Sequence, residues 1–273
     1  MTFNRHVMFT QFQDPLISGF ARITIQNSSS LDRNLILDIA DTIQKARVHP
    51  KPSSVFSRSG DPVLERVFDF LDRKRFHISW SKLVLLGCSA GGNVALRSLF
   101  KHLIVPHIPI IIVMHHNPGF KFLTKLDLAN STFQRIIPVK DGEPIRGSRL
   151  YFLPGEMETG FSRQTKSFVV KPVNYKQRFR PDIDKAFAAA GARFRENVIG
   201  VILSGMLNDG AEGTKTIFLN RGEVWVQQPS TALFKEMPNA AIKTVPTVKI
   251  KTLQQIAEKI NQISLNDLTI KPI

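Results

Sequence analysis

The sequence has very little cysteine: Cys88 is the only one in 273 residues. A single thiol excludes an intrachain disulfide framework and a cysteine-rich metal site, and it agrees with a reducing compartment. Long apolar runs are missing too, since no uninterrupted run reaches about 18 residues and residues 1–12 lack the apolar core of a signal peptide. These absences predict a cytoplasmic protein that does not insert into a membrane.

Acidic residues are few relative to basic ones, 22 against 37, and the net charge is +15. This excess predicts attraction to polyanions, which include nucleic acid, anionic lipid and acidic protein surfaces. Residues 160–195 carry nine Lys and Arg residues against Asp182 and Asp184, as in a docking face, although a charged run is also typical of a solvated surface. No nucleic-acid motif or interleaved aromatic row accompanies the charge, so we do not expect a nucleic acid as the partner.

Cofactor and metal signatures are also lacking. The glycines of the GCSAGG segment, residues 87–92, follow neither G-x-G-x-x-G nor G-x-x-x-x-G-K-[ST], which excludes the dinucleotide and P-loop fingerprints. The seven histidines are not at paired ligand spacing with acids or cysteines. We therefore expect no cofactor and no metal site.

What the chain does contain is typical of a globular protein, with 42% apolar and 22% charged residues. Residues 47–62 hold three prolines and four serines without periodicity, which predicts a linker. We expect a short N-terminal extension over residues 1–80, one domain over 81–265 and a C-terminal tail over 266–273. Within the extension, the patterns predict a strand over residues 20–26 and helices over 32–46 and 63–75.

From residue 81 onward, short apolar runs alternate with helical periodicity. The predicted strands cover residues 82–86, 109–114, 149–153, 167–170, 198–203, 224–227 and 247–251. The predicted helices cover residues 91–103, 119–130, 182–194, 210–220, 231–242 and 253–263. Runs such as IPIIIVM and NVIGVILSG have no polar face, as expected for strands covered on both sides. The pattern predicts a doubly wound α/β fold, a mostly parallel sheet with helices on both faces.

Ligands of such sheets bind beyond the carboxyl ends of the strands, and three predicted strand ends carry reactive side chains. GCSAGG follows the first strand, HHNPG the second and SGMLNDG a later one. Ser89 has the G-x-S-x-G spacing of a nucleophile on a tight strand-to-helix turn, although such a serine is often only a helix cap. The order Ser, His, Asp along the chain argues against an α/β-hydrolase, whose order is Ser, Asp, His.

A serine nucleophile needs a base, and the base needs an orienting carboxylate. His115 and His116 are equally available from spacing alone. Asp209 lies at the third strand end, where it could orient the histidine or simply cap the helix that follows. The residues therefore favour a nucleophilic serine site but leave the choice of histidine open.

Several motifs together give the sequence a specific resemblance. G-x-S-x-G-G, P-G-F after a histidine-bearing strand, and G-M-x-x-D-G match residues 87–92, 115–120 and 205–210. DGEPIRGSRLYFLPG, RFRPDID and QQPSTALFKEMPNAA add further matches. Residues 81–263 thereby resemble the catalytic domain of CheB, the chemotaxis protein-glutamate methylesterase, which has a Rossmann-like doubly wound fold.

The resemblance implies a site and chooses His115 over His116. Ser89 would be the nucleophile, His115 the base and Asp209 the orienting acid. The backbone N–H groups of Met206 and Ala90 would form the oxyanion hole. Substrate-binding roles are implied for three further residues: Arg178, Arg180 and Asn208.

The implied activity is hydrolysis of glutamyl methyl esters, and deamidation of glutamine, on the acidic helical bundle of a methyl-accepting chemoreceptor. Departures from the family pattern limit the match. The family usually has threonine where this chain has Ala90, and residues 1–80 are too few for the receiver domain with which CheB proteins of the common type begin. The alternative is a catalytically weakened CheB-like module that binds or scaffolds receptors without turnover.

Overall fold

The computed structural model describes residues 24–25, 76–103, 108–116, 136–147, 149–172, 180–266 and 269–272. The predicted linker at 47–62 and the predicted helices at 32–46, 63–75 and 119–130 lie outside these residues. So does Arg178.

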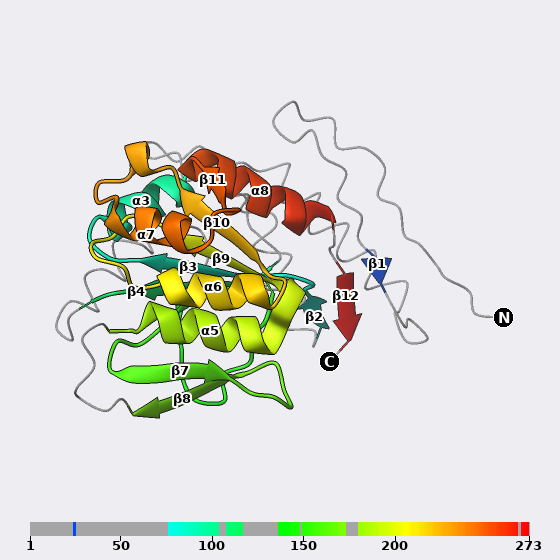
Figure 1. Cartoon of the computed structure of the whole chain (residues 1–273). Helices are drawn as coiled ribbons and strands as arrows, with labels where there is room; N and C mark the ends of the chain where they lie inside the picture. The colour runs from blue at the N-terminus through cyan, green and yellow to red at the C-terminus, as the bar shows by residue number, and fades with distance from the viewer. Residues whose placement is uncertain are drawn as a thin grey trace, which may run out of the picture.

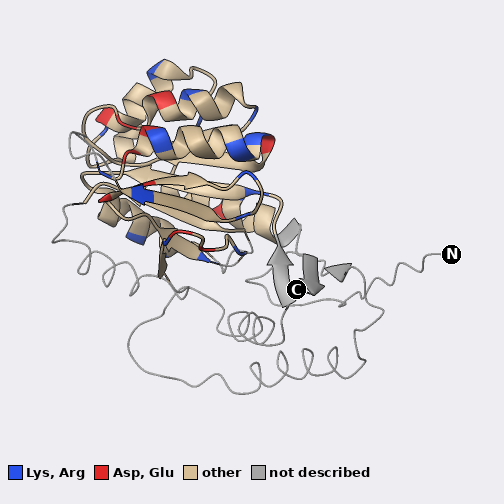
Figure 2. Cartoon of the chain, turned by 90° about the horizontal axis from the view of Figure 1, so that it is seen from below, with Lys and Arg blue, Asp and Glu red and all other residues tan. Residues whose placement is uncertain are grey.

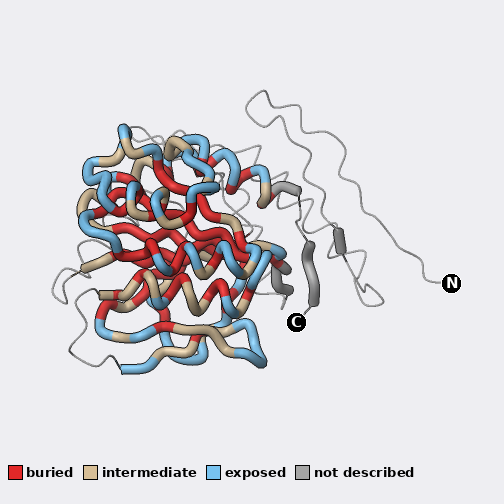
Figure 3. Tube along the Cα trace, viewed as in Figure 1, coloured by how far each residue is buried: buried red, intermediate tan, exposed pale blue. Residues whose placement is uncertain are grey.

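Seven parallel strands form the central sheet, in the order β11-β10-β9-β3-β4-β6-β5 (Figure 1). Its strands are β3 (Leu83–Cys88), β4 (Ile110–Met114), β5 (Ile136–Pro138), β6 (Leu150–Phe152), β9 (Val198–Ile202), β10 (Glu223–Gln227) and β11 (Lys249–Lys251). Every residue of β3, β4 and β9 is buried, as their continuous apolar runs require (Figure 3). The predicted doubly wound α/β fold is confirmed.

Helices cover both faces of this sheet. They are α3 (Gly92–Phe100), α5 (Ile183–Phe194), α6 (Ala211–Leu219), α7 (Glu236–Thr244) and α8 (Leu253–Asn266). Helices α5, α6 and α7 pack side by side on one face, and α3 packs with α8 on the other (Figure 1). The chain runs from β3 toward β4 and β6, then returns to β9 and continues the other way to β10 and β11. The switch in direction between β3 and β9 is where a doubly wound sheet leaves a crevice for ligands.

The predicted strand at residues 167–170 is present but lies outside the central sheet. It is β8 (Phe168–Pro172), which pairs antiparallel with β7 (Met157–Phe161) in a separate hairpin against α5. Strands β5 and β7 were not predicted. The predicted helix at 231–242 starts later, because a 3-10 turn at Pro229–Thr231 precedes α7.

A second sheet joins segments from both ends of the chain. Its order is β1 (Thr24–Ile25), β12 (Thr269–Pro272) and β2 (Phe76–Ser79). Strand β12 runs parallel to β1 and antiparallel to β2. The expected C-terminal tail at 266–273 therefore contains a strand that pairs with the end of the expected N-terminal extension.

Candidate active site

Ser89 lies on a tight turn between β3 and α3. Its N–H donates to the Ser204 carbonyl at 3.0 Å, and its own carbonyl accepts the Gly92 N–H at 2.8 Å. Gly91 caps α3 with φ of 73°, a left-handed conformation that favours glycine. A Cβ at position 91 would also lie 2.7 Å from the Ser204 hydroxyl oxygen. The glycine thus allows the chain to turn sharply while Ser204 packs beneath it.

His115 directly follows β4 and connects the other two side chains of the predicted triad. The backbone N–H of His115 donates to the Cys88 carbonyl at 3.1 Å, which places His115 beside the end of β3. Its Nδ1 lies 3.0 Å from Ser89 Oγ, and its Nε2 lies 2.6 Å from Asp209 Oδ2. An ionised carboxylate only accepts hydrogen bonds, so Nε2 carries the hydrogen and Nδ1 accepts the serine hydroxyl. The serine-protease triad uses the two ring nitrogens in the opposite order.

Asp209 is buried and is held by three donors. Its Oδ2 accepts the Nε2–H of His115 and the Ile183 N–H at 3.0 Å, and its Oδ1 accepts the Asp184 N–H at 3.0 Å. Burial by itself would raise the pKa of Asp209, but the hydrogen bonds from His115 and from the first turn of α5 outweigh it and lower the pKa. Asp209 therefore stays ionised and can stabilise a protonated His115.

His116, the other candidate base, points to a different environment. Its ring stacks on Phe152 with centroids 5.3 Å apart, and its Nε2 lies 3.4 Å from the Leu153 carbonyl oxygen. Its N–H donates to the Arg180 carbonyl at 3.1 Å. The histidine that lies between Ser89 and Asp209 is His115.

The loop from Ser204 to Gly210 is fixed by contacts that the sequence analysis did not anticipate. The Ser204 hydroxyl donates to the Ala90 carbonyl at 2.8 Å and accepts the Phe234 N–H at 3.0 Å. The Ser204 N–H donates to the Gln227 side-chain carbonyl at 2.9 Å. These contacts tie together β9, β10 and the turn of Ser89, and the loop they hold includes Leu207 at a strained φ of 63°.

The two predicted oxyanion-hole donors lie on the two turns just described. Ala90 follows Ser89, and Met206 lies in the loop that Ser204 begins. Within the described part of the chain, neither backbone N–H has a hydrogen-bond partner. Met206 and Leu207 are each 49% exposed, so this side of the site presents apolar side chains to solvent.

The predicted substrate-binding residues border the same region. Arg180 is half-buried, and its carbonyl bonds to the residue after His115. Asn208 is exposed directly before Asp209, and its carbonyl accepts the Ala211 N–H at 3.2 Å. Asn208 is therefore the chain neighbour of Asp209, and the Arg180 backbone is hydrogen-bonded to the chain neighbour of His115.

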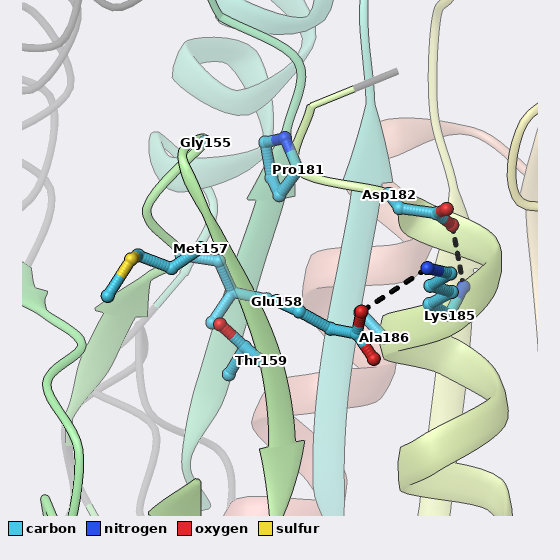
Figure 4. A pocket seen from close by; sticks show the side chains of 9 residues that line it. Gly155, Met157, Glu158, Thr159, Pro181, Asp182, Lys185 and Ala186 are labelled. Atoms are coloured by element: carbon cyan, nitrogen blue, oxygen red, sulfur yellow. Dashed lines mark hydrogen bonds and ion pairs between the residues drawn. The ribbon is translucent and has the colours of Figure 1, made fainter. Parts of the chain in front are cut away.

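A small separate pocket lies between β7 and the first turn of α5 (Figure 4). Among its lining residues, Lys185 Nζ and Glu158 Oε2 form an ion pair 3.3 Å apart, and the Asp182 carboxylate accepts the Lys185 backbone N–H. Neither Ser89 nor His115 nor Asp209 lines this pocket. The geometry of the triad residues, rather than this cavity, marks the candidate active site.

Some of the basic residues in the 160–195 segment make contacts within the chain. Lys166 lies 4.1 Å from the centroid of the Trp80 ring, and the Arg193 Nε donates to the Ser162 carbonyl at 2.7 Å. Basic and acidic residues are interspersed on the outer helices (Figure 2).

In the ranges that the structure describes, no three His, Cys, Asp or Glu residues are grouped as metal ligands. No described helix is both long enough and apolar enough to span a bilayer.

A serine, a histidine and a buried carboxylate hydrogen-bonded in series at the carboxyl ends of parallel strands are typical of a serine hydrolase on an α/β fold. The family model of the CheB methylesterase matches residues 84–260. The chain belongs to the CheB methylesterase family, a family of hydrolases, and the resemblance found in its motifs is confirmed.

Curated relatives bear matching names. A protein-glutamate methylesterase/protein-glutamine glutaminase of the group 2 operon of Bradyrhizobium diazoefficiens is 29% identical over 204 residues, 72% of this chain and 51% of the relative. The enzyme named protein-glutamate methylesterase/protein-glutamine glutaminase from Salmonella typhimurium is 29% identical over 190 residues, 67% of this chain and 53% of the relative. The chain therefore spans about half the length of the curated relatives it matches.

A solved structure shares the fold. The Thermotoga maritima CheB methylesterase catalytic domain matches with a TM-score of 0.63 and 25% identity, covering 68% of this chain and all of that domain. The domain in this chain thus has the architecture of a CheB catalytic domain.

Proposed function

We propose that this protein hydrolyses glutamyl methyl esters on methyl-accepting chemoreceptors, and deamidates receptor glutamine, with Ser89, His115 and Asp209 as its triad. One observation carries the proposal: the Ser89 hydroxyl, the His115 ring and the Asp209 carboxylate form a continuous hydrogen-bonded row, with distances of 3.0 and 2.6 Å. The names of the curated relatives supply the substrate class.

In the first half of the reaction, Ser89 Oγ attacks the ester carbonyl and its proton passes to His115 Nδ1. The negative charge that develops on the carbonyl oxygen is stabilised by the N–H groups of Ala90 and Met206. When the tetrahedral intermediate collapses, the carbon–oxygen bond to the methoxide breaks. His115 protonates the methoxide, methanol leaves and a Ser89 ester of the glutamyl group remains.

In the second half, a water molecule gives its proton to His115 and attacks the Ser89 ester. The bond to Ser89 Oγ breaks, Oγ takes the proton back and glutamate is released. Asp209 keeps the His115 ring in one tautomer and stabilises the imidazolium in both halves. With a glutamine substrate, ammonia leaves in place of methanol.

The proposed substrate is a large one, an acidic helical bundle in the cytoplasmic region of a receptor, so the proposal includes a cytoplasmic location. The exposure of Met206, Leu207 and Asn208 beside the triad supports access for a macromolecule. The net charge of +15 favours an acidic partner. Arg178 and Arg180 are the residues we propose for contact with the substrate.

The test is methanol release from methylated chemoreceptor membranes. We expect release by the wild-type protein and by a control, Ser81→Ala, which removes the hydroxyl of an exposed serine. Ser89→Ala should lower the rate by a factor of about 10³ or more. Equal release by Ser89→Ala and the wild type would reject the nucleophile. Receptor binding by the wild type without methanol release would favour a scaffolding module instead.

A further inference from the structure

The N-terminal ends of helices α5 and α6 are linked by reciprocal hydrogen bonds between carboxylates and backbone N–H groups. Asp209 directly precedes Gly210, the N-cap of α6, yet it accepts the first two N–H groups of α5, those of Ile183 and Asp184. In return, the side chain of Asp184, in the first turn of α5, accepts the Gly213 N–H of α6 at 2.6 Å. Each helix therefore has N-terminal donors satisfied by an acid from the other helix or from the loop that enters it.

The two helix ends touch through their backbones at this point. A Cβ on Gly213 would lie 2.8 Å from the Asp184 carbonyl oxygen and 2.9 Å from the Asp184 Cα. Backbone atoms cannot move aside as the end of a flexible side chain can, so only glycine permits this approach. The contact leaves little freedom for α6 to slide or rotate against α5.

The position of α6 matters for the triad because Asp209 stands two residues before the helix begins at Ala211. The hydrogen bond between His115 Nε2 and Asp209 Oδ2 is 2.6 Å long, and such a charge-assisted bond weakens once its atoms separate beyond about 3.2 Å. A catalytic arrangement tolerates displacements of only about 0.5 Å. A small movement of the start of α6 would therefore disturb the orienting carboxylate.

We propose that Asp184 is a positioning residue for the triad: its carboxylate, bound to the Gly213 N–H, fixes the start of α6 so that Asp209 reaches His115. This inference rests on the proposed function. The neighbouring acid Asp182 does not share the role, because its carboxylate accepts the Lys185 N–H of its own helix.

The electrostatics of Asp184 agree with a functional position. Burial, followed by the negative charges of Asp209 and Asp182, raises its pKa to about 6, although the N–H groups of Gly213 and Gly210 act to lower it. A carboxylate kept where its surroundings disfavour the charge is more typical of functional sites than of neutral surface positions.

The test compares steady-state kinetics of the full chain for three substitutions at Asp184. Asp184→Asn keeps an oxygen acceptor for Gly213 and should retain kcat within about threefold of the wild type. Asp184→Glu keeps the charge but lengthens the side chain by one methylene group, and Asp184→Ala removes the acceptor. We expect kcat to fall about 10-fold in Asp184→Glu and 10- to 100-fold in Asp184→Ala, with KM changed less than twofold. Glu212→Ala, which removes an exposed acid in the first turn of α6, serves as the control.

A spectroscopic readout separates this inference from the proposed function. The proton on His115 Nε2 should give a low-field ¹H NMR resonance that persists in Asp184→Asn and moves upfield in Asp184→Glu, whatever substrate the enzyme uses. Wild-type kcat and an unmoved resonance in Asp184→Glu would overturn the positioning role, even if Asp184→Ala does not fold. Loss of kcat in Asp184→Asn equal to that in Asp184→Glu would overturn it too, because an oxygen acceptor kept at its normal distance from the Gly213 N–H would then fail to preserve activity.

Discussion

Replacing Asp209 by asparagine tests the link between the hydrogen-bond geometry and the chemistry. The Asp209 carboxylate accepts hydrogen bonds from three donors. An asparagine amide can face these donors in two orientations, and neither satisfies all three. If its oxygen faces His115 and Ile183, its NH₂ group meets the Asp184 N–H, donor against donor. If its NH₂ group faces His115, it meets the Ile183 N–H and favours the tautomer with the hydrogen on Nδ1, which cannot accept the proton of Ser89.

Both orientations leave a donor of α5 without an acceptor and remove the charge that stabilises the imidazolium. The unpaired donor should lower the free energy of unfolding by about 1–3 kcal/mol. The lost charge or inverted tautomer should lower kcat/KM by about 10³ to 10⁴, or about 4–5.5 kcal/mol of transition-state stabilisation. Urea unfolding and methanol release measure the two effects, with Glu212→Gln as an acid-to-amide control on α6. A folded Asp209→Asn protein with kcat/KM within tenfold of the wild type would refute this reasoning.

Three further changes follow from the structure. Ser204→Ala leaves the Ala90 carbonyl and the Phe234 N–H without the hydroxyl that they contact. We expect the free energy of unfolding to fall by about 1–3 kcal/mol and kcat to fall about tenfold. A variant with the urea midpoint and the kcat of the wild type would contradict this. Gly91→Ala forces a side chain to φ of 73° and toward Ser204, and should lower the free energy of unfolding by at least about 1–2 kcal/mol; a stability equal to wild type would show that the turn can rearrange. The pKa of Asp184 is about 6 against an ordinary 3.8, so the folded state binds the carboxyl proton more tightly than the unfolded state does. The contribution of this proton to the free energy of unfolding is therefore complete below about pH 4 and is lost as the pH rises through about 6. Asp184→Asn cannot ionise, so its free energy of unfolding should rise relative to that of the wild type by on the order of 1 kcal/mol between pH 4 and pH 7, after allowance for solvent screening at a half-buried group. Urea unfolding that shows the same difference between the two proteins at every pH would exclude this linkage.

The elements that position the site could be predicted because their sequences carry strong local signals. The run at 198–203 has no polar face and forms the fully buried β9 (Val198–Ile202), and the period of residues 182–194 matches α5 (Ile183–Phe194). Strands β5 and β7 could not be predicted in this way. Strand β5 has only three residues and ends in proline, and β7 has a single buried residue, Thr159.

The residue types of the site were predictable from motifs, but their mutual arrangement was not. The sequence indicates a serine, a histidine and an aspartate at three strand ends, whereas only the fold shows that Nδ1 of His115 faces the serine. Ser204 and Gln227 act through contacts between segments far apart in the chain, which no local pattern reveals. Phe234 donates its N–H to the Ser204 hydroxyl, and α7 begins after this contact, at Glu236 rather than at the predicted residue 231.

The central claim is that His115 activates Ser89 for nucleophilic attack, and covalent labelling with a phosphonylating reagent measures that activation without needing a receptor. Intact-mass measurement and peptide mapping should find a single adduct, on Ser89, in the wild-type protein. His115→Ala should slow its formation by at least about 10³-fold. Labelling of Ser89 at the same rate with and without the imidazole, or an adduct only on another serine, would contradict the claim.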